Sequence, residues 1–175
     1  MAAESARQPL DPLTSATVTT AWVIFANKPF YPLYVWWLVG SGVETSLWTL
    51  IAAPLFLAVA LMAHRFPLAA RIAVPLIGTV DTVFETKIFG AGSGTELFLA
   101  PCIMLVALSF YAEERWWQRG MVALIFCIFA AAHTRLGTAL HIWNDKDLAT
   151  LFNLNAFAVA SLMAFIALRW PPRTR

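Results

Sequence analysis

The chain has 175 residues, of which 60% are hydrophobic and 13% are charged, and its formal net charge is +2 at pH 7. This composition excludes an ordinary water-soluble domain, because a soluble core of this size needs far less apolar surface. The small net charge argues against nucleic acid as a partner. The two cysteines, Cys102 and Cys127, each lie in an apolar run, so we expect buried packing thiols and no disulfide framework.

Three long uncharged runs indicate helices that cross a membrane. Residues 45–63, 97–112 and 148–168 contain no charged side chain, and about 20 apolar residues are needed to cross the hydrocarbon core as a helix. Strands of a membrane barrel would alternate apolar and polar side chains, which these runs do not. We therefore predict an all-α integral membrane protein that is embedded in a lipid bilayer.

The expected elements follow in chain order. Residues 1–15 form a polar N-terminal tail, and residues 16–28 form a short interfacial amphipathic helix that stops before Pro29, because proline disfavours helical geometry in the residue before it. Residues 29–170 form a transmembrane domain, and residues 171–175 form a cytoplasmic tail. The domain is predicted to be a bundle of about six helices, over residues 30–42, 45–63, 67–88, 95–111, 117–140 and 148–170.

Basic residues distinguish the two sides of this bundle. Nine of them lie at the boundaries that six spans place with the termini, namely Arg7, Lys28, Arg65, Arg71, Arg115, Arg119, Arg169, Arg173 and Arg175. The other three, Lys87, Arg135 and Lys146, lie at the opposite boundaries. Loops rich in Lys and Arg face the cytoplasm, so both termini are expected there. Residues 30–63 could make two passes or one broken pass, and one pass would move the N-terminus to the other side.

Two carboxylates in the third span are the first candidates for a functional site. Asp81 and Glu85 are four residues apart and share a helix face, where like charges repel unless a proton or a cation intervenes. The candidate counter-charges are Lys87, Arg135 and a bound metal. Such a pair could belong to an internal salt-bridge network, or it could bind a cation, a proton or a ligand.

Further polar residues are expected on the same, non-cytoplasmic side of the bundle. Glu44 and Glu96 each follow a glycine turn of the form GSGxE, which places a carboxylate in the first turn of a helix, where the helix dipole favours it. With Arg135, they complete the predicted ligand or cation site.

Two histidines of the fifth span raise the question of a metal. His133 and His141 could join Asp81, Glu85 or Glu96 in holding a divalent transition metal, or they could only hydrogen-bond to neighbours. Haem is disfavoured, because His64, the remaining histidine, is expected at the opposite boundary. No cofactor is therefore assigned, and a divalent metal is the one that these residues could hold.

A short pattern around the second glycine turn resembles the six-helix membrane regions of bacterial sensor histidine kinases and class III adenylate cyclases. In those regions a turn of the form G-x-x-S-G-x-E-x-F precedes an apolar span, and Gly90, Ser93, Gly94, Glu96 and Phe98 occupy these positions here. The resemblance implies a sensor-like domain of the bacterial inner membrane. Because five residues follow Trp170, we expect a stand-alone version whose output passes to a protein partner or a second copy.

No nucleophile with a neighbouring base, phosphate-binding loop or zinc motif is evident, so no enzyme is predicted. The favoured hypothesis is a non-enzymatic inner-membrane protein of sensor or regulatory type, with a polar ligand or cation site at the periplasmic end of helices three to five. The alternatives are a cofactor- or metal-holding subunit of a larger membrane complex, and a small cation- or proton-coupled transporter in which Asp81 and Glu85 titrate.

Overall fold

The computed structural model describes residues 9–133 and 135–170, and within them all regular secondary structure is helical. The prediction of an all-α protein is therefore confirmed. In chain order the elements are α1 (Pro12–Asn27), α2 (Phe30–Leu38), α3 (Val43–Ser46), η1 (Leu47–Ala52), α4 (Ala53–Met62), α5 (Pro67–Phe89), η2 (Ala91–Ser93), η3 (Thr95–Phe98), α6 (Leu99–Leu108), η4 (Ala112–Glu114), α7 (Arg115–Ala132) and α8 (Asp145–Arg169).

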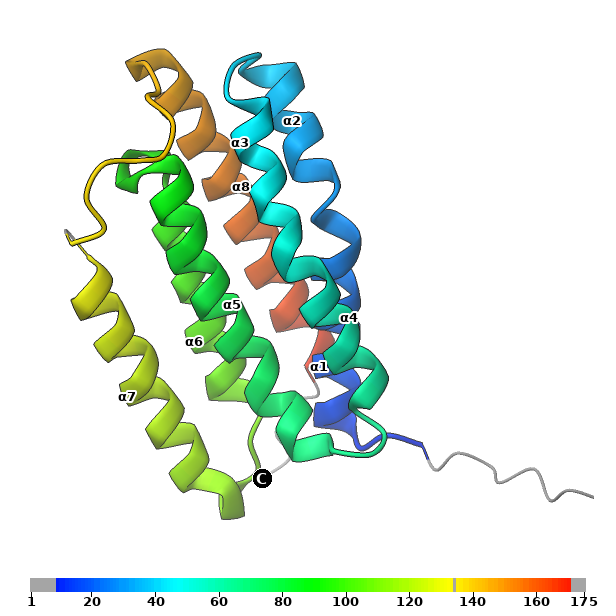
Figure 1. Ribbon diagram of the computed structural model, residues 1–175. Coiled ribbons are helices and arrows are strands. Elements are labelled where there is room, and N and C mark those ends of the chain that lie inside the picture. The colour runs from blue at the N-terminus through cyan, green and yellow to red at the C-terminus, as the bar shows by residue number, and fades with distance from the viewer. Residues whose placement is uncertain (1–8, 134, 171–175) are drawn as a thin grey trace, which may run out of the picture.

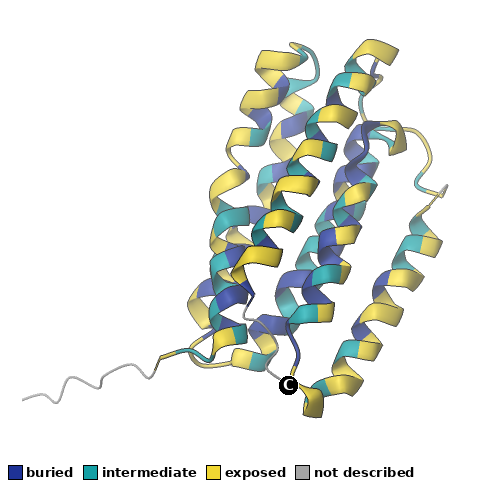
Figure 2. Ribbon diagram, turned by 180° about the vertical axis from the view of Figure 1, so that it is seen from behind, coloured by how far each residue is buried: buried dark blue, intermediate teal, exposed yellow. Residues whose placement is uncertain are grey.

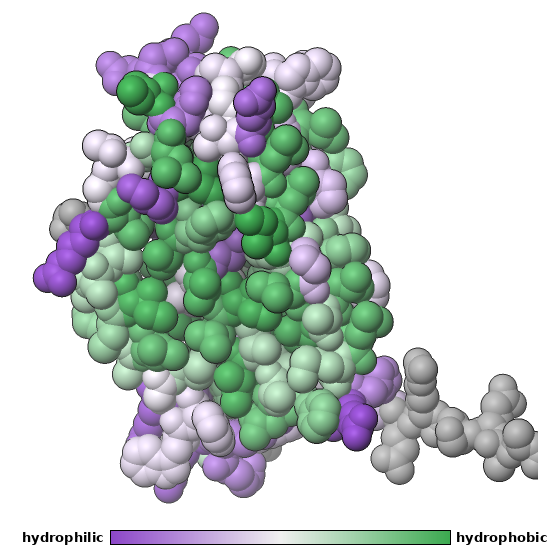
Figure 3. All heavy atoms as spheres, viewed as in Figure 1, coloured by the Kyte–Doolittle hydropathy of each residue, from purple (hydrophilic) through white to green (hydrophobic). Residues whose placement is uncertain are grey.

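The helices lie lengthwise beside one another in a bundle (Figure 1). The α1 and α2 helices follow one another along one side, and α3, η1 and α4 return beside them. The space-filling view shows a broad belt of hydrophobic side chains between two polar ends (Figure 3). That distribution is the one expected when the middle of a protein faces lipid and its ends face water.

By length and composition, three helices in the described part of the chain can cross a membrane: Val43–Met62, Pro67–Phe89 and Asp145–Arg169. A further pair, Thr95–Leu108 and Ala112–Ala132, meets the same criterion only when taken together, and it is bent by 119°. Because of that bend, α7 turns back beside α6 (Figure 1). These helices indicate a membrane protein.

The N-terminal helix differs from its predicted form as a separate surface helix. It packs along α4 and α5, and its buried Ala16 and Ala21 join a core cluster with Ala60 and Ala63 of the α4 end. The helix also begins earlier than predicted, because Pro12 occupies its first turn and Asp11 caps it. Residues 12–15 of the predicted tail are therefore helical, whereas residues 1–8 and 171–175 lie outside the described residues.

Residues 30–63 form two limbs that run in opposite directions. The first limb is α2, and the second is α3, η1 and α4. The turn between them contains Gly40 and Gly42, whose φ angles of 80° and 63° are costly for any residue with a Cβ. The first limb extends back through α1, so the chain reaches this turn through a longer helical segment than residues 30–42.

The α7 helix, which corresponds to the predicted fifth span, ends at Ala132, eight residues before the predicted end at residue 140. His133 leaves helical geometry with ψ 125°, and Gly137 adopts a positive φ of 68°. The Lys87 ammonium then holds the loop by donating to the carbonyls of Leu136, at 2.8 Å, and Thr138, at 2.7 Å. The residues after Ala132 were predicted to be helical because they are mostly apolar. They form a loop instead, and two of its carbonyls accept hydrogen bonds from Lys87 of α5.

Buried residues gather where the helices face one another, and exposed residues cover the outward faces (Figure 2). The α7 helix is the most exposed of the long helices, since Met121 and Ile125 are its buried residues. Large apolar side chains on its outer surface include Trp116 and Phe126. In water such a surface would be unfavourable, whereas in a bilayer it meets hydrocarbon.

Candidate functional site

A break between α1 and α2 places a lysine inside the bundle. Pro29 has no backbone N–H to continue the helical hydrogen bonding, yet Lys28 before it keeps helical angles of φ −51° and ψ −46°. The two helices are thus nearly continuous, and Lys28 points inward with 8% of its surface exposed. It lies ten residues before the end of α2, or about 15 Å by helix rise.

The α5 helix supplies two carboxylates at the same depth. Asp81 lies eight residues before the last residue of α5, which corresponds to about 12 Å. Glu85 follows one turn later on the same face. Buried hydroxyls lie beside them, and each donates to the carbonyl four residues earlier, Thr79 to Pro75 at 2.7 Å and Thr82 to Gly78 at 2.8 Å. These bonds satisfy the threonines internally, so their burial carries no unpaired hydroxyl.

Lys28 bridges the two acids, and we call these three residues the charge cluster. Its Nζ donates to Oδ2 of Asp81 and, at 2.7 Å, to Oε1 of Glu85. All three side chains are about nine-tenths buried. The second oxygen of each acid, Oδ1 of Asp81 and Oε2 of Glu85, accepts no hydrogen bond from the described residues.

The charge cluster is unbalanced. With every group ionised it holds two negative charges and one positive charge. A net charge inside an apolar bundle is unfavourable, because low-dielectric surroundings solvate it poorly. One proton or one monovalent cation is enough to make the cluster neutral.

A cavity of about 510 Å³, which we call the central cavity, lies against the charge cluster. This volume falls within the range of pockets that bind small molecules, about 300–1,000 Å³. Asp81, Glu85 and Lys28 form part of its wall, together with side chains of α1, α2, α4, α6 and α8. Most of the other lining side chains are apolar or aromatic, including Phe56, Phe98 and Phe165.

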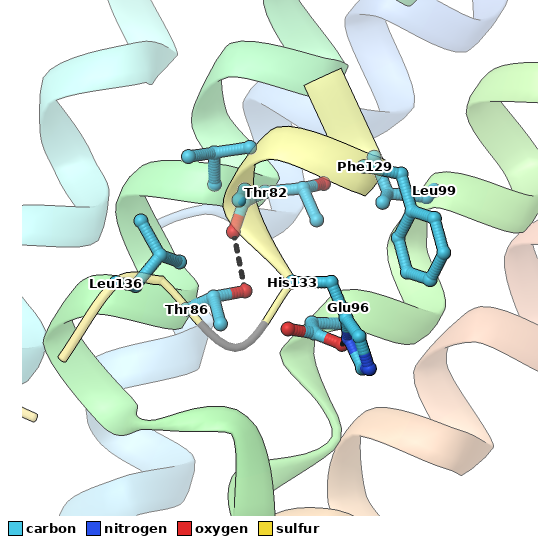
Figure 4. A pocket seen from close by; sticks show the side chains of 9 residues that line it. Thr82, Thr86, Glu96, Leu99, Phe129, His133 and Leu136 are labelled. Atoms are coloured by element: carbon cyan, nitrogen blue, oxygen red, sulfur yellow. Dashed lines mark hydrogen bonds and ion pairs between the residues drawn. The ribbon is translucent and has the colours of Figure 1, made fainter. Parts of the chain in front are cut away.

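A second pocket lies around Glu96 and His133. These side chains point toward one another in Figure 4, and Nδ1 of His133 is 3.0 Å from Oε2 of Glu96. The cavity beside them measures about 10 Å³, at the lower limit of the space that one water needs, which is about 10–15 Å³. Glu96 and His133 thus form a side-chain hydrogen bond at the bundle end, with no room for a larger ligand.

The structure does not gather the other predicted residues into the same site. Glu44 is exposed at the start of α3, and Arg135 lies in the loop after α7. The partner of Asp81 and Glu85 is Lys28, not Arg135. The ring of His141 packs against Trp143, with centroids 4.4 Å apart. In the described residues no three His, Cys, Asp or Glu side chains come together to hold a metal ion. The predicted metal pair of His133 and His141 is therefore not assembled with a third ligand.

A second buried charge occurs at the opposite end of α5. Arg71 is 4% exposed and forms a two-pronged ion pair with Glu114, at 2.6 and 2.7 Å, while also donating to the Ser109 carbonyl at 3.0 Å. Its guanidinium lies over the ring of Tyr111, 5.0 Å from the centroid. This arrangement ties α5 to the turn between α6 and α7. The sequence analysis counted Arg71 only among the cytoplasmic boundary residues.

The same end of the bundle holds the helix cap of α1. Asp11 accepts hydrogen bonds from the Thr14 backbone N–H, at 3.0 Å, and from the Tyr111 hydroxyl, at 2.9 Å. Partial burial acts to raise the pKa of Asp11, but these hydrogen bonds and the positive charge of Arg71 together outweigh it and hold the pKa below its ordinary value. The carboxylate form is therefore the one that the folded protein stabilises.

Lys28 is the functional candidate that sequence reasoning missed. Its neighbour Pro29 suggested the end of a helix at the membrane surface, so Lys28 was counted with the cytoplasmic boundary residues. One signal was available, since a basic residue four positions after Ile24 continues an apolar helical face. The unmatched pair Asp81 and Glu85 also required a counter-charge, which Lys28 supplies in place of Lys87 or Arg135.

Comparison with models of protein families, with curated proteins and with solved structures finds no match to this chain.

Proposed function

We propose that this chain is a non-enzymatic polytopic membrane protein of sensor or regulatory type, in which a small molecule binds in the central cavity. One observation carries the proposal: the charge cluster of Lys28, Asp81 and Glu85 forms part of the wall of a cavity of about 510 Å³. Ionisable groups at membrane depth are expensive, at roughly 2.5–3.5 kcal/mol each on insertion scales, and they usually serve a site or a pathway.

The proposed binding site lies deeper than the one expected from the sequence. The sequence placed the site at the periplasmic end of the predicted third to fifth spans, which correspond to α5, α6 and α7. The pocket at Glu96 measures only about 10 Å³ there. The larger cavity reaches further along the bundle and includes both acids of α5. We therefore keep Asp81 and Glu85 as binding residues, add Lys28, and leave Glu44, Glu96 and Arg135 outside the site.

The proposed arrangement in the bacterial inner membrane has six passes, with α1 and α2 together as the first. Arg65, Arg71, Arg115, Arg119 and Arg169 then fall at one end of the bundle, and Lys87, Arg135 and Lys146 fall at the other. The first end is assigned to the cytoplasm on this excess of arginine. The cytoplasmic end would carry the signal to a protein partner or to a second copy.

The binding proposal is tested by measuring thermal unfolding of the purified protein against a library of small molecules. A true ligand raises the midpoint of the wild type and leaves Ala158→Trp unchanged, because the added ring fills the cavity from α8 without altering a charge. Glu113→Gln is the matched control, since Glu113 is exposed and lies in η4. Equal shifts in the wild type and Ala158→Trp would contradict binding in this cavity.

The sensor role needs its own test. Pull-down from the native membrane, with and without the ligand found above, should recover a partner whose yield changes with the ligand. Ala158→Trp should abolish that change while keeping the basal yield. A ligand that binds but never alters a partner or the oligomeric state would remove the sensor role.

A proton-coupled carrier is the second candidate, and the helix break favours it. Carriers often place their site beside an interrupted helix, and here the break at Pro29 adjoins the charge cluster. In proteoliposomes, a carrier would show proton flux that Glu85→Gln abolishes. Flux that is the same for wild type, Glu85→Gln and empty liposomes would rule the carrier out.

A further inference from the structure

We infer that the molecule held in the central cavity is a lipophilic monovalent cation, whose charged centre lies against Asp81 and Glu85 and whose apolar body fills the rest of the cavity. This inference rests on the proposed function, namely that the cavity binds a small molecule, and it names the chemical class of that molecule.

The charge of the cluster selects the sign of the ligand. Two acids face one lysine, so a monovalent cation brings the cluster to neutrality, whereas an anion would leave it with two excess negative charges. Lys28 gives two of its three N–H donors to the acids, whose two negative charges outweigh its attraction for an anion. Each acid keeps one carboxylate oxygen without a hydrogen bond from the described residues, which is available to a positive centre.

The other walls of the cavity select an apolar ligand body. Leu105, Leu154 and Phe165 line it beside the aromatic rings of Tyr34 and Trp37. Aromatic faces attract cations, most strongly when water is excluded. An inorganic ion alone would leave most of the 510 Å³ unfilled, whereas a cation with several apolar groups would contact both the acids and these walls.

The entrance of the cavity favours a ligand that arrives from the lipid. Trp37 of α2 and Phe157 of α8 both line the cavity, yet they are 76% and 74% exposed. The cavity therefore reaches apolar side chains on the outer surface of these two helices. A hydrophobic cation dissolves in a bilayer and could enter there without crossing water.

Binding of such a cation competes with a proton, because either one neutralises the cluster. The charged residues that face the cavity are Lys28, Asp81 and Glu85, and its other titratable linings are Tyr31 and Tyr34 of α2 and Cys102 of α6. The described lining residues of α1, α4 and α8 carry no ionisable group. The cation should therefore bind more weakly as the pH falls.

Tetraphenylphosphonium and tetraphenylborate provide a matched pair of probes, since they share one shape and carry opposite charges. Their binding is measured to the full chain in nanodiscs of phosphatidylcholine, and Ala158→Trp in the same nanodiscs provides the background of lipid partitioning. We expect the wild type to bind the phosphonium above this background and the borate not at all. Lowering the pH should weaken phosphonium binding by up to about tenfold per unit, the limit for one competing proton.

Two variants test the role of the acids. Glu85→Gln makes the cluster neutral while keeping the pair of Lys28 and Asp81, so it should weaken phosphonium binding at least about tenfold, as 1.4 kcal/mol of lost charge attraction would. Asp81→Asn provides a second neutral cluster in case the first variant folds poorly. Glu44→Gln removes an exposed carboxylate outside the cavity and should bind within twofold of the wild type.

Equal binding of the two probes, or unchanged phosphonium binding in both acid variants, would overturn the cation inference. The neutral fluorescent probe N-phenyl-1-naphthylamine separates this failure from that of the proposed function. If it binds the wild type above Ala158→Trp while the phosphonium does not, the cavity binds small molecules but not cations. If no probe distinguishes wild type from Ala158→Trp, the proposed function fails as well.

Discussion

The Lys28 ammonium lies 2.7 Å from Oε1 of Glu85, although 57 residues separate the two along the chain. The contact joins the junction of α1 and α2 to the second half of α5, and Asp81 shares it. Because all three groups are about nine-tenths buried, each depends on the others for its solvation.

The first prediction concerns Lys28 as the counter-charge. Lys28→Met leaves two buried carboxylates without a cation, so we expect the free energy of unfolding to fall by about 3–5 kcal/mol. The midpoint of thermal unfolding in detergent should drop accordingly. The exposed lysine Lys146 provides the control, and Lys146→Met should stay within about 0.5 kcal/mol of the wild type.

The triple variant Lys28→Met, Asp81→Asn, Glu85→Gln separates lost charge balance from lost packing. Since it removes every charge of the cluster, it should recover most of the stability that Lys28→Met loses. A Lys28→Met protein as stable as the wild type, or a triple variant no better than the single one, would show that the cluster is not balanced in this way.

The second prediction concerns the geometry of Arg71. Arg71→Lys keeps the positive charge but cannot form both prongs to Glu114 and also reach the Ser109 carbonyl. We expect a loss of about 1–3 kcal/mol in stability. Arg119→Lys is the matched control, because Arg119 is exposed and stacks on Trp116. A double-mutant cycle with Glu114→Gln should show coupling, and strictly additive losses would contradict the two-pronged pair.

The charge cluster and the pair of Arg71 and Glu114 mark the limit of what the sequence could predict. The helical class, the bounds of α5 within one residue and the need of Asp81 and Glu85 for a partner all followed from apolar runs and helical spacing. The identity of the partner did not, because it depends on which helices pack together. Lys28 was misplaced because the helix end beside Pro29 was expected at the membrane surface, whereas α2 continues the chain beyond it and Lys28 lies inside the bundle.

The residues of the predicted polar site do not all lie together, for a related reason. Because the segment is apolar, the predicted fifth span was extended to residue 140. That prediction placed Arg135 and His141 on or beside a helix face with His133. The chain instead leaves the helix at His133, and Lys87 donates to the loop carbonyls rather than to the acids of its own helix. Loop carbonyls also need hydrogen-bond donors, and a sequence does not show which carbonyls a lysine can reach.

The third prediction concerns pH and Asp11. Hydrogen bonds from Thr14 and Tyr111 favour its carboxylate in the folded protein, so its pKa is lower folded than unfolded. The stabilisation is thus complete above the unfolded pKa, for which the ordinary value is 3.8, and it is lost as the pH falls through the lower, folded pKa.

Asp11→Ala removes both the helix cap and the Tyr111 contact, at a cost of about 1 kcal/mol near neutral pH. The difference in stability between wild type and Asp11→Ala should shrink as the pH is lowered below about 4. Unfolding by denaturant at a series of pH values measures it. A difference that stays constant down to pH 2 would mean that the charge of Asp11 contributes nothing.

The fourth prediction compares the two glycines of the turn between α2 and α3. Gly40 and Gly42 both have positive φ, so alanine at either one costs about 1–2 kcal/mol in backbone energy. Their surroundings differ. A Cβ on Gly40 would meet nothing within 4 Å, whereas a Cβ on Gly42 would collide with the ring of Trp143, 2.7 Å from Cζ3.

Gly42→Ala should therefore lower the free energy of unfolding by about 1–3 kcal/mol more than Gly40→Ala does, because the ring is overpacked. Its thermal midpoint should be the lower of the two. In a Trp143→Leu background the collision with the ring is removed, so the difference between the two alanine variants should shrink to what the 3.0 Å contact with His141 Cδ2 leaves. Trp143 is 92% buried and stacks on Phe89 with centroids 5.6 Å apart, so its ring cannot move aside without disturbing the core beneath the turn. Equal losses for Gly40→Ala and Gly42→Ala in the wild-type background would show that the ring does yield, and that backbone conformation alone requires glycine at both positions.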